Sequence, residues 1–135
     1  MFRPICNLQI WRTGQIAACA DVSYYQCVMR LTGQPAGLPV IAASTLMDDT
    51  QDEVNLTWAK RLTFDVADRG KARRLTDLLS RQHLVAVYTD ERGVRRVCGS
   101  ADHPLHLSTA IRGGRISCEL RGTGVHADPV LSLNI

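Results

Sequence analysis

Four side chains of this sequence have the chemical types and the proximity of a metal site: Cys98, His103, His106 and Cys118. Structural zinc sites favour cysteine pairs separated by two to four residues, a spacing that these four residues lack. Cys118 shares parity with Ile116 and Leu120 and is expected to face the core, whereas His106 has the opposite parity to Leu105 and Leu107 and is expected to face solvent. We therefore predict buried thiols and surface imidazoles, with no metal and no cofactor.

Ser100, Asp102 and His103 are the residue types of a catalytic triad. Triads are assembled from distant segments, and no strained G-x-S-x-G elbow is present. The turn propensity of Ser and Asp explains their proximity better. The glycine-containing segments match neither the Walker pattern nor the dinucleotide fingerprint. We predict a protein that is not an enzyme and has no catalytic residues, and a small hydrolase around His103 is the least favoured hypothesis.

The whole chain has a formal net charge of +3, and its basic side chains are concentrated in the second half. A candidate basic or interface face consists of six arginines: Arg69, Arg73, Arg74, Arg81, Arg95 and Arg96. Such a face could follow phosphates, but acidic residues are interleaved and no aromatic-rich strand offers a platform for base stacking. A solvated face or an intersubunit ion-pair surface is the favoured interpretation, and a small nucleic-acid-binding module is the alternative.

Composition limits the class of protein. The 135 residues fit one domain, 1–135, with enough apolar side chains to bury a core. Five cysteines, an odd number without framework spacing, indicate a reducing compartment. No apolar run reaches the roughly 20 residues that span a bilayer, so we expect a soluble protein without a membrane partner.

Residues 54–66 show the alternation that the rest of the chain is built around. Six apolar side chains fall on one parity: Val54, Leu56, Trp58, Leu62, Phe64 and Val66. Only Lys60 interrupts that set, which predicts a long strand with one buried face and a bend or bulge near Lys60 and Arg61.

A helix over about 69–81 follows, with Asp68 as its expected N-cap. Its expected apolar stripe consists of Ala72, Leu75, Leu78 and Leu79. Residues 84–89 then predict a buried strand, residues 90–93 a tight turn, and residues 94–98 the returning strand of a hairpin.

The flanking segments are less regular. A first strand is expected after Pro4, and residues 15–32 admit either a helix or a strand. Residues 33–53 are expected to form an extended arm or loop. Residues 105–111 and 116–120 predict two strands joined by a Gly113-Gly114 hairpin, with residues 122–124 breaking the second. The alternation at residues 131, 133 and 135 suggests a closing edge strand or a segment donated to a partner sheet.

These expectations define an α+β, mainly β fold: an antiparallel β-sandwich or split barrel of about six to eight strands with one main helix. The candidate core consists of seven residues: Trp58, Leu62, Phe64, Leu75, Leu78, Val85 and Val87.

Residues 54–130 resemble small tail-module structural proteins of Mu-like phages and prophages of Bacteroides-type bacteria. That family shows an alternating strand and a short helix before a V-V-V-x-T-D-x-x-G-x-x-R-x-x-G run. The matching positions here are Val85 to Thr89, Asp90, Gly93, Arg96 and Gly99, then Pro104-Leu105, Gly122-Thr123 and Pro129. The first 50 residues and the cysteine content depart from the pattern.

The resemblance implies a structural virion protein, tail-tube-like or distal-tail-like, that forms a homo-oligomeric ring and is assembled in the bacterial host cytoplasm. The implied partners are copies of itself and neighbouring tail proteins. Assembly is expected to use the 33–53 arm, the terminal strand and the charged helix face. Long unpaired sheet edges are a hazard for a monomer, and a closed ring removes them.

Overall fold

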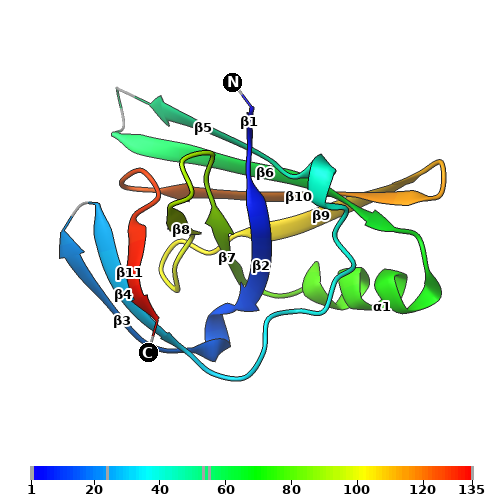
Figure 1. Cartoon of the computed structure of the whole chain (residues 1–135), viewed down its shortest axis with the longest axis horizontal. Helices are drawn as coiled ribbons and strands as arrows, with labels where there is room; N and C mark the ends of the chain where they lie inside the picture. Colours follow the sequence, from blue (N-terminus) through cyan, green and yellow to red (C-terminus); the bar gives the residue numbers. More distant parts are fainter. Residues whose placement is uncertain (1, 24, 53, 55, 135) are drawn as a thin grey trace.

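Two β-sheets and one α-helix make up the protein, as a computed structural model shows (Figure 1). The structure describes residues 2–23, 25–52, 54 and 56–134, with side chains through Leu131 in the last strand. The mainly β, α+β sandwich predicted from the sequence is confirmed. The described residues contain eleven strands rather than six to eight, because residues 15–32 and 46–52, which lack a clear alternation, also form strands.

The first sheet has five strands in the order β1-β5-β6-β10-β9. Its strands are β1 (Arg3–Pro4), β5 (Leu46–Asp52), β6 (Thr57–Ala67), β9 (His106–Arg112) and β10 (Arg115–Gly124). β6 pairs with β5 and β10 without a register shift. The bulge predicted near Lys60 is therefore wrong: Lys60 lies in unbroken register with Asp49 and Gly122.

The alternation of β6 buries the face that packs on the second sheet. Leu62, Phe64 and Val66 are buried there, whereas Trp58 is only partly buried. The strand begins at Thr57, so the start predicted at residue 54 is wrong. Val54 is 90% exposed, and Leu56 has a positive φ of 55° that interrupts the extended backbone.

The second sheet has six strands in the order β2-β7-β8-β11-β4-β3. Its strands are β2 (Cys6–Arg12), β3 (Ile16–Ser23), β4 (Gln26–Leu31), β7 (Leu84–Thr89), β8 (Arg95–Cys98) and β11 (Val130–Asn134). β2 and β3 are the two outer strands, yet only the three-residue helix η1 (Thr13–Gln15) joins them. The sheet must therefore curl so that its two edges converge at η1.

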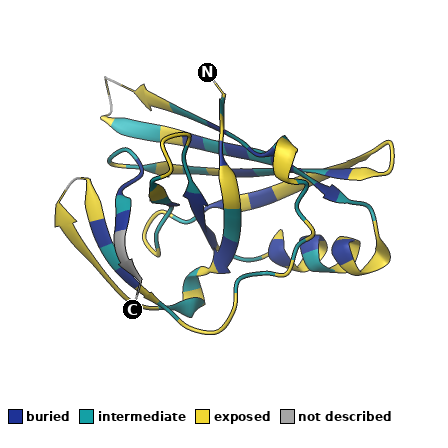
Figure 2. Ribbon diagram, in the orientation of Figure 1, coloured by how far each residue is buried: buried dark blue, intermediate teal, exposed yellow. Residues whose placement is uncertain are grey.

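This curl creates two hydrophobic clusters on opposite faces of β7. Leu84, Ala86 and Tyr88 pack between the two sheets. Val85 and Val87 pack with Trp11, Met29 and other side chains of the curled sheet. Both faces of β7 are covered, which explains why the successive residues Leu84 to Tyr88 are all buried (Figure 2).

Helix α1 (Gly70–Leu79) lies within the predicted range, but two expectations about it are wrong. The N-cap residue is Arg69, and Asp68 instead accepts hydrogen bonds from Arg73. Leu78 is 47% exposed rather than in the core. The buried stripe is Ala72, Thr76 and Leu79, with Leu75 partly buried, because at 3.6 residues per turn Leu78 lies roughly 100° from Leu79.

Residues 32–45 connect the two sheets and contain the short helix η2 (Ala42–Ser44). Ala36, Leu38 and Val40 pack against the core between the sheets, and the Ile41 amide donates to the Asp65 carbonyl at 2.8 Å. Residues 46–52 form β5 inside the first sheet. The expectation of an extended arm over 33–53 is therefore wrong for its second half.

The end of the chain also differs from expectation. β11 lies between β8 and β4, parallel to β4, so it is neither an edge strand nor a segment free to be donated. Residue 135 lies outside the described residues. Residues 122–124 do not break β10: Gly122 lies within the strand, where a Cβ atom would be 2.7 Å from Leu105 Cδ2 and 2.9 Å from the Pro104 carbonyl oxygen. None of the described helices has the length and apolar character needed to cross a membrane.

Leu79 and Leu78 offer a matched test of the helix orientation. Leu79→Ala removes a fully buried side chain and should lower the free energy of unfolding by about 2–5 kcal/mol. Leu78→Ala removes an exposed side chain at nearly equal helix propensity and should change it by less than about 0.5 kcal/mol. Urea denaturation followed by circular dichroism measures both, and equal losses would contradict the orientation.

Candidate functional site

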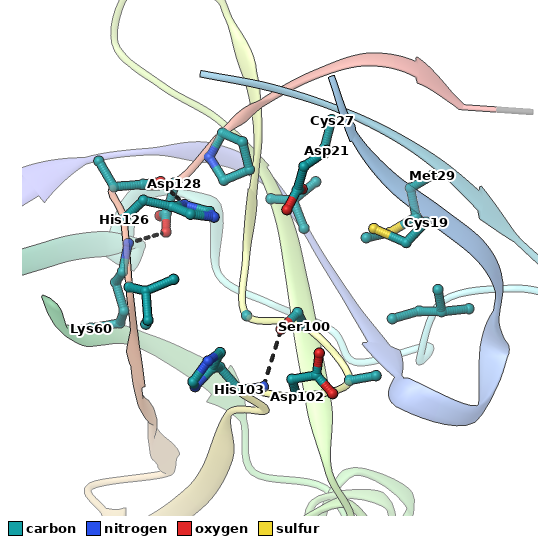
Figure 3. Close-up of a pocket in the computed structure, with 18 of the residues that line it drawn as sticks. Cys19, Asp21, Cys27, Met29, Lys60, Ser100, Asp102, His103, His126 and Asp128 are labelled. Carbon is teal, nitrogen blue, oxygen red and sulfur yellow. Dashed lines mark hydrogen bonds and ion pairs between the residues drawn. The ribbon is translucent and has the colours of Figure 1, made fainter. Parts of the chain in front are cut away.

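A cleft of about 530 Å³ lies beside the β3–β4 hairpin and is the best candidate for a functional site (Figure 3). Strands β3 and β4 form one wall. The turn at residues 99–103 and the segment at residues 123–129 form the other sides. Lys60 of β6 also lines it, so the cleft gathers residues from both sheets and from four separate parts of the sequence.

A buried ion pair lies where the two sheets meet at this cleft. Lys60 Nζ lies 2.6 Å from Asp128 Oδ1, and both residues are only 5% exposed. The Tyr88 hydroxyl donates a hydrogen bond to the other carboxylate oxygen, Asp128 Oδ2, at 2.5 Å. Lys60 belongs to β6 and Tyr88 to β7, so the Asp128 carboxylate links the two sheets of the sandwich.

Two neighbours of this carboxylate, Tyr88 and Cys98, have raised pKa values. Burial, and next the charge of Asp128, raise the pKa of the Tyr88 hydroxyl far above its usual value. Burial and then Asp128 also raise the pKa of the Cys98 thiol. Arg96 fixes the segment from outside by donating to the Asp128 main-chain oxygen at 2.9 Å and pairing with Asp90 at 2.8 Å. The cluster has the features of a structural network, because each polar group in it has a bonded partner.

The four residues considered as a metal set are not brought together. Cys98 and Cys118 are buried between the sheets, whereas His103 and His106 are exposed. The His106 ring stands edge-on to the ring of His83, with centroids 5.1 Å apart. Among the described residues, no group of three or more Cys, His, Asp and Glu side chains is arranged to hold a metal ion.

Ser100, Asp102 and His103 lie together at the cleft, but their contacts are those of a turn. Ser100 Oγ accepts a hydrogen bond from the His103 amide at 3.1 Å, and the Ser100 amide donates to the His103 carbonyl at 3.0 Å. Figure 3 shows the Asp102 carboxylate and the His103 ring on opposite sides of the turn. The geometry lacks the serine–imidazole and imidazole–carboxylate contacts of a triad.

Two thiols line the cleft, and neither is activated as a nucleophile. Burial, together with the neighbouring Asp21, raises the pKa of Cys19. Burial, then Cys19 and Asp21, raise the pKa of Cys27 to about 11. A raised thiol pKa leaves little thiolate near neutral pH, which disfavours nucleophilic chemistry.

The six candidate arginines do not form one basic surface. The arginines of α1 lie near the start of β7. Arg95 and Arg96 lie at the start of β8, beyond the turn that follows the end of β7 (Figure 1). Six strand residues at about 3.3 Å each separate the two groups by about 20 Å. Three of the six are neutralised in ion pairs: Arg73 with Asp68, Arg81 with Asp77, and Arg96 with Asp90. Arg69 and Arg74 remain near the helix, and Arg95 lies on β8.

The ion pair between Lys60 and Asp128 is not predicted from the sequence, although the position of Lys60 indicates a buried charge. Lys60 stands on the apolar parity of its strand, which places a charge on the buried face. A buried lysine requires a buried acceptor. Asp128, 68 residues away in a turn-like segment, has no pattern that would identify it as that acceptor.

Comparison of the chain with protein-family models, with curated proteins and with solved structures finds no match.

Lys60 and Asp128 should show strong energetic coupling. Lys60→Met and Asp128→Asn each leave one buried polar partner uncompensated and should each lower the free energy of unfolding by about 3–5 kcal/mol. The double variant should cost less than the sum of the single changes. Arg81→Met, in an ion pair whose side chains are 75% and 67% exposed, is the control and should cost less than about 1 kcal/mol. Additive single losses in urea denaturation would contradict the coupling.

Cys27 should make stability depend on alkaline pH. Its folded pKa of about 11 lies above the ordinary thiol value of 9.0, so its full contribution to stability is present below pH 9. That contribution is lost as pH rises from 9 through 11, because the unfolded chain then releases its proton first. Cys27→Ala should flatten the fall in unfolding free energy by at most about 1.4 kcal/mol per pH unit. Urea midpoints measured from pH 8 to 11 test this, and identical slopes would refute it.

Proposed function

We propose that this protein is a non-enzymatic structural protein of a phage tail or a related injection apparatus, and that copies of it assemble into a homo-oligomeric ring. The ring would be a tail tube, terminator or distal-tail ring of the virion, assembled in the bacterial host cytoplasm. Its partners would be copies of itself and neighbouring tail proteins. The resemblance of residues 54–130 supports the tail assignment, and one feature of the fold supports the assembly.

That feature is the outer strand β3, which pairs with β4 on one side and has no strand partner on the other among the described residues. It is eight residues long and forms one edge of the six-stranded sheet. Every residue of β3 after Ile16 is exposed, although the run is mostly small or apolar, with Asp21 as its only charge. Monomeric proteins usually protect such edges with lysines, prolines or bulges. β3 has no lysine or proline, and its register with β4 shifts only near its two ends, between Ile16 and Ala18 and between Asp21 and Ser23, so residues 18–21 form a regular stretch of edge. An edge of this kind is suited to pairing with another chain.

Exposed apolar side chains at the hairpin ends give a second line of support. Val22 and Tyr25 at the β3–β4 end are 62% and 75% exposed, and Val54 and Leu56 between β5 and β6 are 90% and 69% exposed. Ile111 on the β9–β10 hairpin is 55% exposed. Large apolar side chains grouped at projecting ends are typical of contact surfaces.

The assembly surfaces therefore differ from those expected from the sequence. β11 is enclosed within its sheet and residues 46–52 belong to the other sheet, so neither is available as a free arm. The hairpin ends and the β3 edge take their place. Nucleic-acid binding remains the alternative, but it is less well supported because the arginines proposed for it lie apart or are paired with carboxylates.

The assembly is tested by changing the β3–β4 end. The purified protein should form a discrete oligomer in light scattering after size exclusion, and a ring in negative-stain electron microscopy. Val22→Lys combined with Tyr25→Lys adds charge to the exposed end and should shift the population toward monomer without changing the folded state.

The control is Leu78→Lys, which adds a lysine at an exposed apolar position on the helix. It should leave the oligomer intact. A strictly monomeric unmodified protein across the whole concentration range would refute the proposed function.

A further inference from the structure

We propose that the β9–β10 hairpin of one copy docks in the cleft beside the β3–β4 hairpin of the next copy, with Arg112 held by the carboxylates of Asp21 and Asp102. The contact is head-to-tail, since two different surfaces of the same protein meet. This inference rests on the proposed function and names the interface through which the ring is built.

The cleft has an apolar base and an acidic rim. Cys27, Met29 and Val97 line it and are at most 2% exposed. Asp21 and Asp102 are exposed at its edge, and within the described residues neither is joined to a cation in an ion pair. Figure 3 shows the two carboxylates on different sides of the cleft.

The other charged side chains of the cleft leave this acidic character in place. The charge of Lys60 is compensated by Asp128 at 2.6 Å. The effect of Asp21 on the pKa of Cys19 agrees with a negative potential at this wall. A cationic group with an apolar stem fits this combination of surfaces.

The β9–β10 hairpin carries that combination at its end. Gly113 and Gly114 form the turn, with φ values of 53° and 79°. Arg112 directly before them is exposed and has no ion-pair partner among the described residues, and Ile111 is 55% exposed. Arg115 is less available because it contacts Asp65 at 3.4 Å. Ile111 and Arg112 are consecutive strand residues whose side chains point to opposite faces of the hairpin, so Arg112 itself supplies both the free cation and the apolar stem.

The two surfaces lie at opposite ends of the molecule. Figure 1 places the β9–β10 hairpin at one end of the longest axis and the β3–β4 hairpin near the other, and Figure 2 shows the end of the β9–β10 hairpin exposed. A protein cannot fill its own cleft with a hairpin held at its far end. Contacts between unlike surfaces repeat from copy to copy, and they give rings when the rotation closes.

The size of the cleft limits what enters it. A volume of about 530 Å³ lies in the range of small-ligand pockets and accommodates a few side chains rather than a pair of strands. The side chain of Arg112 would enter, and the hairpin backbone would remain at the rim.

Exchange of charge between the two surfaces tests the contact. One variant carries Asp21→Lys and Asp102→Lys, and the other carries Arg112→Glu. Each variant alone presents like charges at the interface, so its assembly in analytical ultracentrifugation should weaken by about 10-fold or more. An equimolar mixture pairs each altered surface with its complement and should recover assembly to within about 3-fold of the unmodified protein.

Two exposed charges elsewhere provide matched controls. Glu91→Lys reverses an acid in the turn after β7, and Arg74→Glu reverses an arginine on the helix. Both should assemble as the unmodified protein does. Thermal unfolding shows whether each variant is folded, and recovery in the mixture requires that both are.

The outcomes separate the two proposals. If the unmodified protein forms rings and the charge-reversed variants assemble equally well, or if their mixture shows no recovery, the docking is wrong and the proposed function stands. If the unmodified protein is monomeric at every concentration, the proposed function fails and the docking fails with it.

Discussion

A buried positive charge is the constraint on which much of this structure depends. β6 runs through the centre of the first sheet in unbroken register, and that register directs Lys60 into the interior. Burying an ammonium group costs several kcal/mol unless a partner compensates it. The chain must therefore deliver Asp128 to this point, and Tyr88 completes the hydrogen bonding of its carboxylate.

The position of Asp128 in turn directs the end of the chain. The segment after β10 crosses from the first sheet to the second, and on the way the Asp128 carboxylate bonds to Lys60 of the first sheet and to Tyr88 of the second. Arg96 and Val97 then hold it by hydrogen bonds to the main-chain oxygens of Asp128 and Pro129. β11 begins at the next residue and enters the second sheet beside β8. The same segment forms one side of the cleft, so the buried ion pair holds that side of the cleft in place.

The sequence pattern predicts those parts of the fold that depend mainly on residues close together in the chain. The strand at Leu84–Thr89, the turn at Gly93 and the Gly113-Gly114 hairpin follow from apolar runs and from glycines with positive φ. The other parts of the fold depend on contacts between residues far apart in the sequence, which the pattern does not predict. The curl of the second sheet depends on β2 and β3 converging at η1, and the partner of Lys60 is 68 residues away. The apolar pattern wrongly predicts that Leu78 is buried, because a polar residue, Thr76, belongs to the buried face of the helix. The Thr76 hydroxyl donates a hydrogen bond to the Ala72 carbonyl, which allows it to be buried.

The curl of the second sheet also explains why one edge stays open. Its outer strands meet only at η1 and diverge from there, so β3 has no partner along its outer side in the described structure. Two copies that met like surface to like surface would bring Asp21 near its own copy at the β3 end, or Arg112 near its own copy at the hairpin end. Both arrangements place like charges together, which disfavours symmetric pairs. The charge distribution therefore favours the head-to-tail contact on which the proposed ring depends.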